Sequence, residues 1–376
     1  MGQTLDATKV YGIDGKVRLM SGELTVPAGT TFAGCTPNSY FLVKPGAKIT
    51  ADGTMAAPIT FTSQTDLEGK SAAGKTGEWG GLIILGNAFV DHGITQYEAG
   101  DAEDTFGSAS HANDTESSGT LNYVLVKHTG FKVDDDKELN GLSLGGVGSG
   151  TSLTNIAIIG GSDDGLEIWG GRPDITGIYV YNAKDDSLDT DLGYRGTITN
   201  AYAVQLNVDK TNSYDSSIFE TGNDSNDLTV TDANATQPTF VNVLGEVKGG
   251  GISMKYDAGM VLQNVVLTSG KTYNDANLSE VDSQLVVYRG PDIVTTDAMH
   301  ASEVCLDLTT THSTTEDFYF AHYNTKISSA TENAYEDWTT NAALSTSWTL
   351  GTTAACTGLN TDTIWKGSVG SNAALE

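Results

Sequence analysis

The sequence contains one unit of about 22 residues written twice in succession between residues 153 and 196. The first copy holds Ile156-Ala157-Ile158 followed by Asp163-Asp164-Gly165, and the second holds Ile178-Tyr179-Val180 followed by Asp185-Asp186-Ser187. A fixed period of this size is typical of a solenoid. Runs of Ile, Val and Tyr that end at Gly, Asn or Asp indicate short strands. The unit therefore predicts an all-β fold, a right-handed parallel β-helix with coils of about 22 residues.

Similar strand signals on both sides extend this prediction along the chain. The apolar run Leu82–Leu85 has the continuous character of a buried strand, and Ile198 lies 23 residues after Ile175. We expect the β-helix to occupy about residues 3–295, with long polar loops at about 91–119 and 207–238. Residues 296–374 are expected to form a C-terminal cap or small appended region, with a short helix at 331–348. The side chains expected to point inward are Ile156, Ile158, Leu166, Ile178, Val180 and Leu188.

Charge excludes several classes of partner. The chain has 20 Lys+Arg against 48 Asp+Glu, a formal net charge of −28. Such a surface repels nucleic acid and anionic membranes and favours cations. The sequence also has no apolar run of 18 residues, so no transmembrane segment is expected.

The ends of the chain and its cysteines bear on location. Met1-Gly2 and Leu375-Glu376 resemble residues left by cloning. We therefore expect a signal peptide upstream of Gln3, removed here, and an extracellular or outer cell-surface location. The three cysteines form no CxxC pair, which argues against a zinc or redox motif. Cys305 and Cys356 are candidates for a disulfide, with Cys35 left single.

The acidic residues of the repeat are the main candidate site. Stacked coils place equivalent residues about 4.8 Å apart, so Asp163 lies near Asp185 and Glu167 near Asp189. Adjacent like charges repel each other, and Ca²⁺ takes six to eight oxygen ligands that would offset this repulsion. The predicted metal ligands are Asp163, Asp164, Glu167, Asp185, Asp186, Asp189 and Asp191.

Three alternatives to calcium remain open for these carboxylates. Asp residues at turns often accept hydrogen bonds from backbone N–H groups, which is a structural role. Paired carboxylates can also catalyse glycoside hydrolysis. Finally, Arg172, Arg195 and Lys184 could supply the opposing charge.

Aromatic and basic residues near the repeat suggest ligand binding. The candidate ligand-binding residues are Trp169, Arg172, Tyr194 and Arg195. Aromatic rings on a β surface can stack on sugars. The alternative is that Trp169 and Tyr194 pack at corners of the coils, where neighbouring glycines leave room for the rings. The six histidines are scattered outside the duplicated unit, so the sequence does not support a His-centred mechanism.

An enzyme remains a second possibility, because many parallel β-helices cleave acidic polysaccharides. The GSDDG segment resembles the paired carboxylates of pectin-degrading glycosidases. The Gly-His-Gly and Arg-Ile-Lys segments of those enzymes do not occur in this sequence. A lyase would need a basic residue beside calcium, and Arg195 is the candidate.

Six motifs, in one order, resemble a family of secreted or lipid-anchored bacterial surface proteins of Bacteroidetes and marine Gram-negative bacteria. They are TGEWGGLIILGNA, SGTLNYVLVKHTG, NGLSLGGVGSGT, SDDGLEIWGG, DDSLDTDLGYRG and IFETGND, within about residues 40–290. The resemblance implies a right-handed parallel β-helix and a surface location, without a defined activity. No lipobox cysteine is found near the start of this chain.

Together these observations predict an exported binding or structural protein rather than an enzyme. Its expected partner is a polysaccharide or another cell-surface component, with calcium as a stabilising ion. The alternative is a calcium-dependent polysaccharide lyase or glycoside hydrolase that acts on an anionic polysaccharide.

Overall fold

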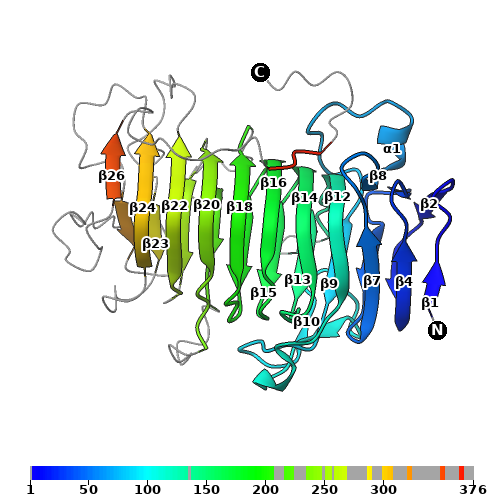
Figure 1. The fold of residues 1–376 in the computed structure, drawn as a ribbon, viewed down its shortest axis with the longest axis horizontal. Coiled ribbons are helices and arrows are strands. Elements are labelled where there is room, and N and C mark those ends of the chain that lie inside the picture. The colour runs from blue at the N-terminus through cyan, green and yellow to red at the C-terminus, as the bar shows by residue number, and fades with distance from the viewer. Residues whose placement is uncertain are drawn as a thin grey trace.

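The computed structural model shows an elongated stack of β-coils (Figure 1). It describes residues 2–133, 137–206, 216–223, 234–247, 250–255, 258–268, 286–289, 299–307, 320–323, 348–351 and 364–367. From residue 286 to 351, only the backbone path and the strand pairing are considered. No helix among the described residues has both the length and the apolar character needed to cross a membrane.

Two long parallel sheets run the length of the stack. The first, sheet A, has the order β1 (Gly2–Thr4), β4 (Gly22–Val26), β7 (Ala47–Asp52), β12 (Gly119–Thr129), β14 (Ser152–Gly161), β16 (Ile175–Ala183), β18 (Thr197–Val204), β20 (Thr239–Glu246), β22 (Met260–Thr268), β24 (Met299–Asp307) and β26 (Trp348–Gly351). The second, sheet B, has the order β3 (Lys16–Leu19), β6 (Tyr40–Val43), β9 (Gly81–Leu85), β13 (Leu142–Gly145), β15 (Leu166–Trp169), β17 (Leu188–Asp191), β19 (Ser217–Thr221), β21 (Gly250–Lys255), β23 (Val286–Arg289) and β25 (Phe320–Tyr323).

Shorter elements complete the first coils. The strands β2 (Val10–Ile13), β5 (Thr31–Gly34) and β8 (Ile59–Ser63) pair in parallel, and β8 joins sheet A through β12. The helix α1 (Gln64–Leu67) follows β8, with Ser63 as its N-cap. The antiparallel pair β10 (Thr95–Gln96) and β11 (Thr105–Phe106) and the 3-10 turn η1 (His111–Asn113) lie in the predicted loop at 91–119.

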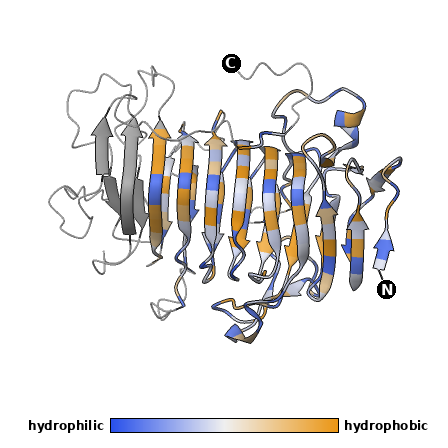
Figure 2. Cartoon of the chain, in the orientation of Figure 1, coloured by the Kyte–Doolittle hydropathy of each residue, from blue (hydrophilic) through white to orange (hydrophobic). Residues whose placement is uncertain are grey.

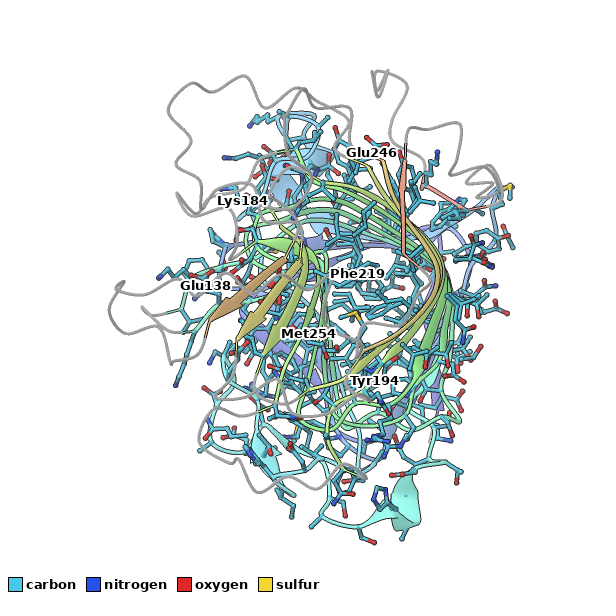
Figure 3. All side chains as sticks on the ribbon, turned by 90° about the vertical axis from the view of Figure 1, so that its left-hand side faces the viewer. Glu138, Lys184, Tyr194, Phe219, Glu246 and Met254 are labelled. Atoms are coloured by element: carbon cyan, nitrogen blue, oxygen red, sulfur yellow. The ribbon has the colours of Figure 1, made fainter. Side chains whose placement is uncertain are left out.

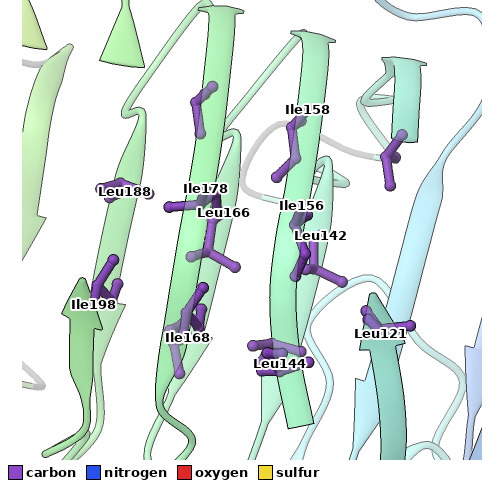
Figure 4. Packing of buried hydrophobic residues seen from close by; sticks show 14 of the residues in the cluster. Leu121, Leu142, Leu144, Ile156, Ile158, Leu166, Ile168, Ile178, Leu188 and Ile198 are labelled. Atoms are coloured by element: carbon purple, nitrogen blue, oxygen red, sulfur yellow. The ribbon is translucent and has the colours of Figure 1, made fainter. Parts of the chain in front are cut away.

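The register of the central strands confirms the predicted repeat. Ile156 pairs with Ile178, Leu166 with Leu188, and Ile175 with Ile198. The chain is therefore a right-handed parallel β-helix, as its period predicts. The six side chains expected to point inward are all at most 1% exposed. Figure 4 shows several of them stacked between the two sheets.

The core lies between the inner faces of sheets A and B. Viewed along the stack, Phe219 from sheet B lies near the centre of this interior (Figure 3). Hydropathy alternates along many of the strands (Figure 2), because successive side chains point to opposite faces. Burying one such aliphatic side chain contributes on the order of 2 kcal/mol to folding. The regular supply of one or two per strand is what allows the coils to stack.

A column of residues with left-handed backbone conformation bends every central strand of sheet A at the same place. It contains Asn155, Gly177, Asn200, Asn242 and Asn264, with φ between 49° and 78°. Asparagine and glycine are the residue types that adopt this conformation most readily. The Nδ2 group of Asn264 donates to Oδ1 of Asn242 at 2.8 Å, and that of Asn242 donates to Oδ1 of Asn200 at 3.1 Å. Stacked side-chain hydrogen bonds thus connect consecutive coils.

Three segments differ from the sequence prediction. Residues 207–238 do not form one loop, because they contain β19 of sheet B. The expected boundary at residue 295 does not coincide with the end of the sheets, since β24, β25 and β26 extend them to Gly351. The predicted helix at 331–348 and Cys356 lie outside the described residues, except that Trp348 begins β26.

A segment near the C-terminus returns to the middle of the stack. Residues 364–367, red in Figure 1, lie on the outer face of sheet A. Ile364 joins an apolar cluster with Leu125 and Tyr179. The indole of Trp365 makes an edge contact with Tyr123, at 5.3 Å between ring centroids. The segment therefore covers apolar side chains on the outside of the coil, where the sequence analysis had placed a cap.

Candidate metal centre on the outer face of sheet B

Three acidic side chains lie in one line across sheet B. Glu167 pairs with Asp189, and Asp189 pairs with Glu220. We call these three residues the carboxylate column. Their neighbours Leu166, Leu188 and Phe219 point into the core, so the pleat of the strands directs the acidic side chains to the outer face.

Four more aspartates occupy the turns that lead into these strands. Asp163 and Asp164 precede β15, and Asp185 and Asp186 precede β17. We call them the turn aspartates. Carboxylate oxygens from the column and the turns come within 4.8 Å of one another in three groups, which share members. The groups are Asp163, Asp164 and Asp185; Asp164, Glu167 and Asp189; and Asp186, Asp189 and Glu220.

Most of these acidic side chains are withdrawn from solvent. Asp164, Glu167, Asp186, Asp189 and Glu220 are all between 3% and 7% exposed. Burial, followed by the charge of Asp163, raises the pKa of Asp164 well above its usual value. Burial, followed by the charge of Asp185, does the same for the pKa of Asp186. The site therefore holds buried carboxylates whose mutual repulsion opposes ionisation.

Hydrogen bonds to backbone groups hold the turn aspartates in place. Asp164 Oδ1 accepts a bond of 2.8 Å from the N–H of Asp186, and Asp186 Oδ1 accepts one from the N–H of Ser217. Each aspartate thus binds the backbone of the next coil, as the structural alternative expects. These bonds use Oδ1, and the opposite oxygens of the same carboxylates can bind a cation.

An insertion covers the outer face of sheet B beside the column. Tyr97 is fully buried and its ring makes an edge contact with Trp169 at 5.5 Å between centroids. Glu98, the next residue, has a pKa raised to about 7 by burial and by the charge of Asp189. The predicted loop at 91–119 thus brings an additional carboxyl group to the site.

Ion pairs attach this insertion to the first coils. The side chain of Asp104 is fully buried and contacts Arg18 Nη2 at 2.7 Å and Lys44 Nζ at 3.3 Å. Burial alone would raise the pKa of Asp104, but the hydrogen bond from Arg18 lowers it to about 2. Arg18 also contacts Asp101 at 2.5 Å. The insertion is therefore attached through buried charges as well as apolar contacts.

The predicted ligand-binding residues lie apart from the acidic groups or are covered. Tyr194 is fully buried, and its hydroxyl donates to Pro173 O at 3.0 Å. A Cβ at Gly196 would lie 2.5 Å from that hydroxyl, so glycine makes room for the ring. Trp169 is 7% exposed, beneath Tyr97 and Phe106. The corner-packing alternative therefore describes both aromatic residues, and neither presents a face for stacking on a sugar.

The two arginines have other partners. Arg172 Nε lies 3.5 Å from Asp114 Oδ2, and its Nη1 donates to Gly171 O and Gly193 O. Arg195 Nε donates to Ala235 O. Asp191 pairs in register with Trp169 and belongs to none of the three carboxylate groups among the described residues. The basic side chain that contacts the column is instead Lys255, whose Nζ pairs with Glu220 Oε1.

Several residues of the site escaped the sequence analysis. Glu220 lies 31 positions after Asp189, so an insertion hides it from a 22-residue period. Asn140, which binds the Glu167 carboxylate and the N–H of Asp164, precedes the duplicated unit. The run Ser216–Thr221 could have identified Glu220, because Glu220 follows the apolar Ile218-Phe219 as Asp189 follows Leu188.

Parallel coils with acidic turns place the chain among the parallel β-helix proteins. A family model described as a pectate-lyase like beta helix domain matches residues 2–351, so the chain belongs to that family. No curated protein and no solved structure gives a match.

The acidic groups have the composition that a hard divalent cation requires. Calcium binds six to eight oxygen atoms at 2.3–2.6 Å, so ligand oxygens on opposite sides of one ion are about 5 Å apart. Separations within 4.8 Å satisfy this limit. All the ligand candidates are carboxylates, which must be ionised to bind a metal. A bound cation would therefore offset the repulsion that raises their pKa values.

Proposed function

We propose that the protein is an exported β-helix protein that binds calcium at the carboxylate column and, through it, an anionic polysaccharide. The observation that carries the proposal is the set of three overlapping carboxylate groups, each with oxygens within 4.8 Å. A cation held by such a group neutralises the repulsion inside the protein. It can also keep coordination positions for carboxylates of a partner, because calcium accepts more ligands than three side chains provide.

A binding role is favoured over catalysis by what the described residues near the column offer. Arg195, the candidate base for a lyase, donates Nε to a backbone carbonyl, and Lys255 is engaged by Glu220. The family description, pectate-lyase like, supports a polysaccharide as the class of partner. The net charge of −28 also makes a bridging cation necessary for an acidic polymer to approach.

The rival function is glycoside hydrolysis, which one observation favours. Glu167 is buried, and burial followed by the charge of Glu98 raises its pKa well above the usual value. A carboxylic acid kept protonated beside an ionised carboxylate is what a glycosidase uses as its acid. In this alternative Glu167 protonates the leaving oxygen and Asp189 acts on the opposite side of the sugar.

The test starts from the metal-free full chain titrated with calcium in a calorimeter. The protein is then offered polygalacturonate and neutral dextran, with calcium or with chelator. We expect saturable calcium binding, retention of polygalacturonate only with calcium, and no change in reducing or unsaturated ends. The variant Asp189→Asn should lose both interactions, whereas the exposed control Asp14→Asn should keep them. Turnover of polygalacturonate would establish the rival, and binding that is unchanged in chelator would contradict the proposal.

The surface location is proposed from the sequence and is tested separately. The natural gene should encode a signal peptide before Gln3. Fractionation of cells that express the natural gene should find the protein outside the cytoplasm. A cytoplasmic protein would contradict this part of the proposal.

A further inference from the structure

The third carboxylate group differs from the other two because a basic side chain adjoins it. It consists of Asp186, Asp189 and Glu220, and Lys255 Nζ contacts Glu220 Oε1. The other oxygen, Glu220 Oε2, is buried and has no hydrogen-bond partner among the described residues. Glu220 is only 5% exposed. A buried carboxylate oxygen without a donor is costly, so this group has an unfilled requirement for positive charge.

A neutral oxygen lies next to the same group. Ser253 pairs in register with Glu220 on the adjacent strand β21. It is 0% exposed, and its Oγ has no hydrogen-bond partner in the described part of the chain. Its neighbours Ile252 and Met254 are buried in the core, so Ser253 lies on the outer face with Glu220. Figure 3 shows Met254 and Phe219 on the inner side of the same two strands.

Lys255 is the source of positive charge at this end of the site. It lies two residues after Ser253 and therefore on the same face of β21. Burial raises the pKa of both Asp186 and Asp191, and the charge of Lys255 acts in the opposite direction on both. Its side chain is 24% exposed, so its flexible stem has a route to solvent.

We propose that Asp186, Asp189 and Glu220, with Ser253 Oγ, form a second divalent-cation position, and that the Lys255 ammonium is a built-in competitor for it. The inference deepens the proposed function and rests on it. A lysine ammonium is a compact single charge, whereas three carboxylates match a divalent ion better. Without the metal, Lys255 balances part of the charge. When a divalent ion binds, Lys255 moves toward solvent and Glu220 contributes both oxygens to the ion.

This arrangement makes the second position weaker than the first by design of the sequence. Every binding event there must displace the ammonium from Glu220. The position at Asp163, Asp164 and Asp185 is formed without Glu220, the partner of Lys255. Calcium should therefore fill the two positions in sequence, and Lys255 should determine the affinity of the later one.

The test compares calcium binding to the full chain and to the variant Lys255→Met by calorimetry. We expect the weaker of two calcium sites to tighten by about tenfold or more, since close charge pairs at this scale couple strongly. The exposed lysine variant Lys70→Met, which also loses one positive charge, serves as the control. Glu220→Gln should remove the weaker site and leave the tighter one. Ser253→Ala should weaken the second site alone.

The outcomes separate this inference from the proposed function. Two calcium sites with identical affinities in wild type and Lys255→Met would overturn the role of Lys255. A single site that persists in Glu220→Gln would overturn the second position and leave the proposed function intact. No calcium binding in the wild type would overturn both. If Lys255→Met does not fold, Lys255→Gln replaces it, and the rise in melting temperature with calcium is compared with that of Lys70→Met.

Discussion

Asp164 Oδ1 accepts a hydrogen bond of 2.8 Å from the backbone N–H of Asp186, its equivalent one coil later. The bond joins two copies of the same repeat position, and it explains why an aspartate recurs there. The carboxylate serves the turn through one oxygen and the acidic site through its charge. The structural and metal-binding interpretations of these aspartates are therefore compatible.

The two roles of Asp164 can be separated by a pair of substitutions. Asp164→Asn keeps a side-chain oxygen for the N–H of Asp186 but removes the charge, whereas Asp164→Ala removes both. In chelator, we expect Asp164→Asn to be as stable as the wild type or more stable, because repulsion is relieved. Asp164→Ala should lose about 1–3 kcal/mol, because it leaves a buried N–H unpaired. Denaturant unfolding in chelator and in calcium measures both, and neither variant should gain the stability that calcium gives the wild type. Equal losses in the two variants would contradict this separation.

The raised pKa values predict an unusual dependence of stability on pH. Burial and neighbouring charge raise the pKa of Glu98 to about 7, against 4.5 for an ordinary Glu. The pKa values of Asp164, Glu167 and Asp186 are raised in the same direction. Between the unfolded and folded pKa values the native state binds more protons than the unfolded state. Stability must therefore fall as pH rises through this interval.

We accordingly expect the melting temperature in chelator to decrease as pH rises from about 4.5 to about 7. Calcium requires ionised ligands, so its stabilising effect should grow over the same interval and oppose the decrease. Melting curves at a series of pH values, with and without calcium, provide the measurement. A melting temperature in chelator that rises steadily from pH 5 to 7 would show that these carboxyl groups do not titrate as described.

The period of the sequence predicts the coils wherever no insertion interrupts it. Leu166 and Leu188, or Ile156 and Ile178, are separated by the repeat length and their pairing follows directly. Glu220 and Lys255 break this regularity, because the chain leaves the coil between β18 and β19 and again near β21. Their place beside Asp189 depends on strand register after an insertion, which no local pattern encodes.

The ligand-binding interpretation of Tyr194 was wrong for a related reason. A sequence shows that an aromatic residue lies near a corner, but not which way the corner turns. The small size of Gly196 and the carbonyl of Pro173 fix the ring inside the coil. The position of Glu98 is likewise set by contacts of the insertion with strands β3 and β6, far away in sequence.

The ion pairs at Asp104 should determine how firmly the insertion is attached. Removing Arg18 leaves a buried carboxylate with Lys44 as its remaining described cation. We expect Arg18→Met to lose about 3 kcal/mol, as is usual when one member of a buried pair is removed. The double variant Arg18→Met with Asp104→Asn should recover part of this loss. Hydrogen exchange of residues 91–106 should increase in the single variant, and unchanged exchange there would contradict the proposed attachment.

The asparagine column of sheet A offers a test of the coil-to-coil bonds. Asn242 has φ of 56° and bonds to Asn200 and Asn264 through its side chain. Asn242→Gly keeps the backbone conformation but loses these bonds, so we expect a loss of about 1 kcal/mol. Asn242→Ala adds the cost of a left-handed conformation, about 1–2 kcal/mol more. Equal stability of the two variants by denaturant unfolding would show that the backbone conformation is not strained.

The same column contains its own natural interruption at Gly177, which separates Asn155 from Asn200. Its φ of 78° suits asparagine, and a Cβ there would lie 3.3 Å from Asn155 Oδ1. That contact is tight, but it involves the end of a side chain that can shift by a few tenths of an ångström. In Gly177→Asn, the new Nδ2 can donate to Asn155 Oδ1, which extends the stacked bonds by one coil. The unfolded chain also loses freedom when glycine is replaced. We expect a gain of up to about 1 kcal/mol in the free energy of unfolding. Gly177→Ala, which brings the Cβ without the amide, should be destabilising, and a loss of stability in both variants would mean that Asn155 cannot yield the space.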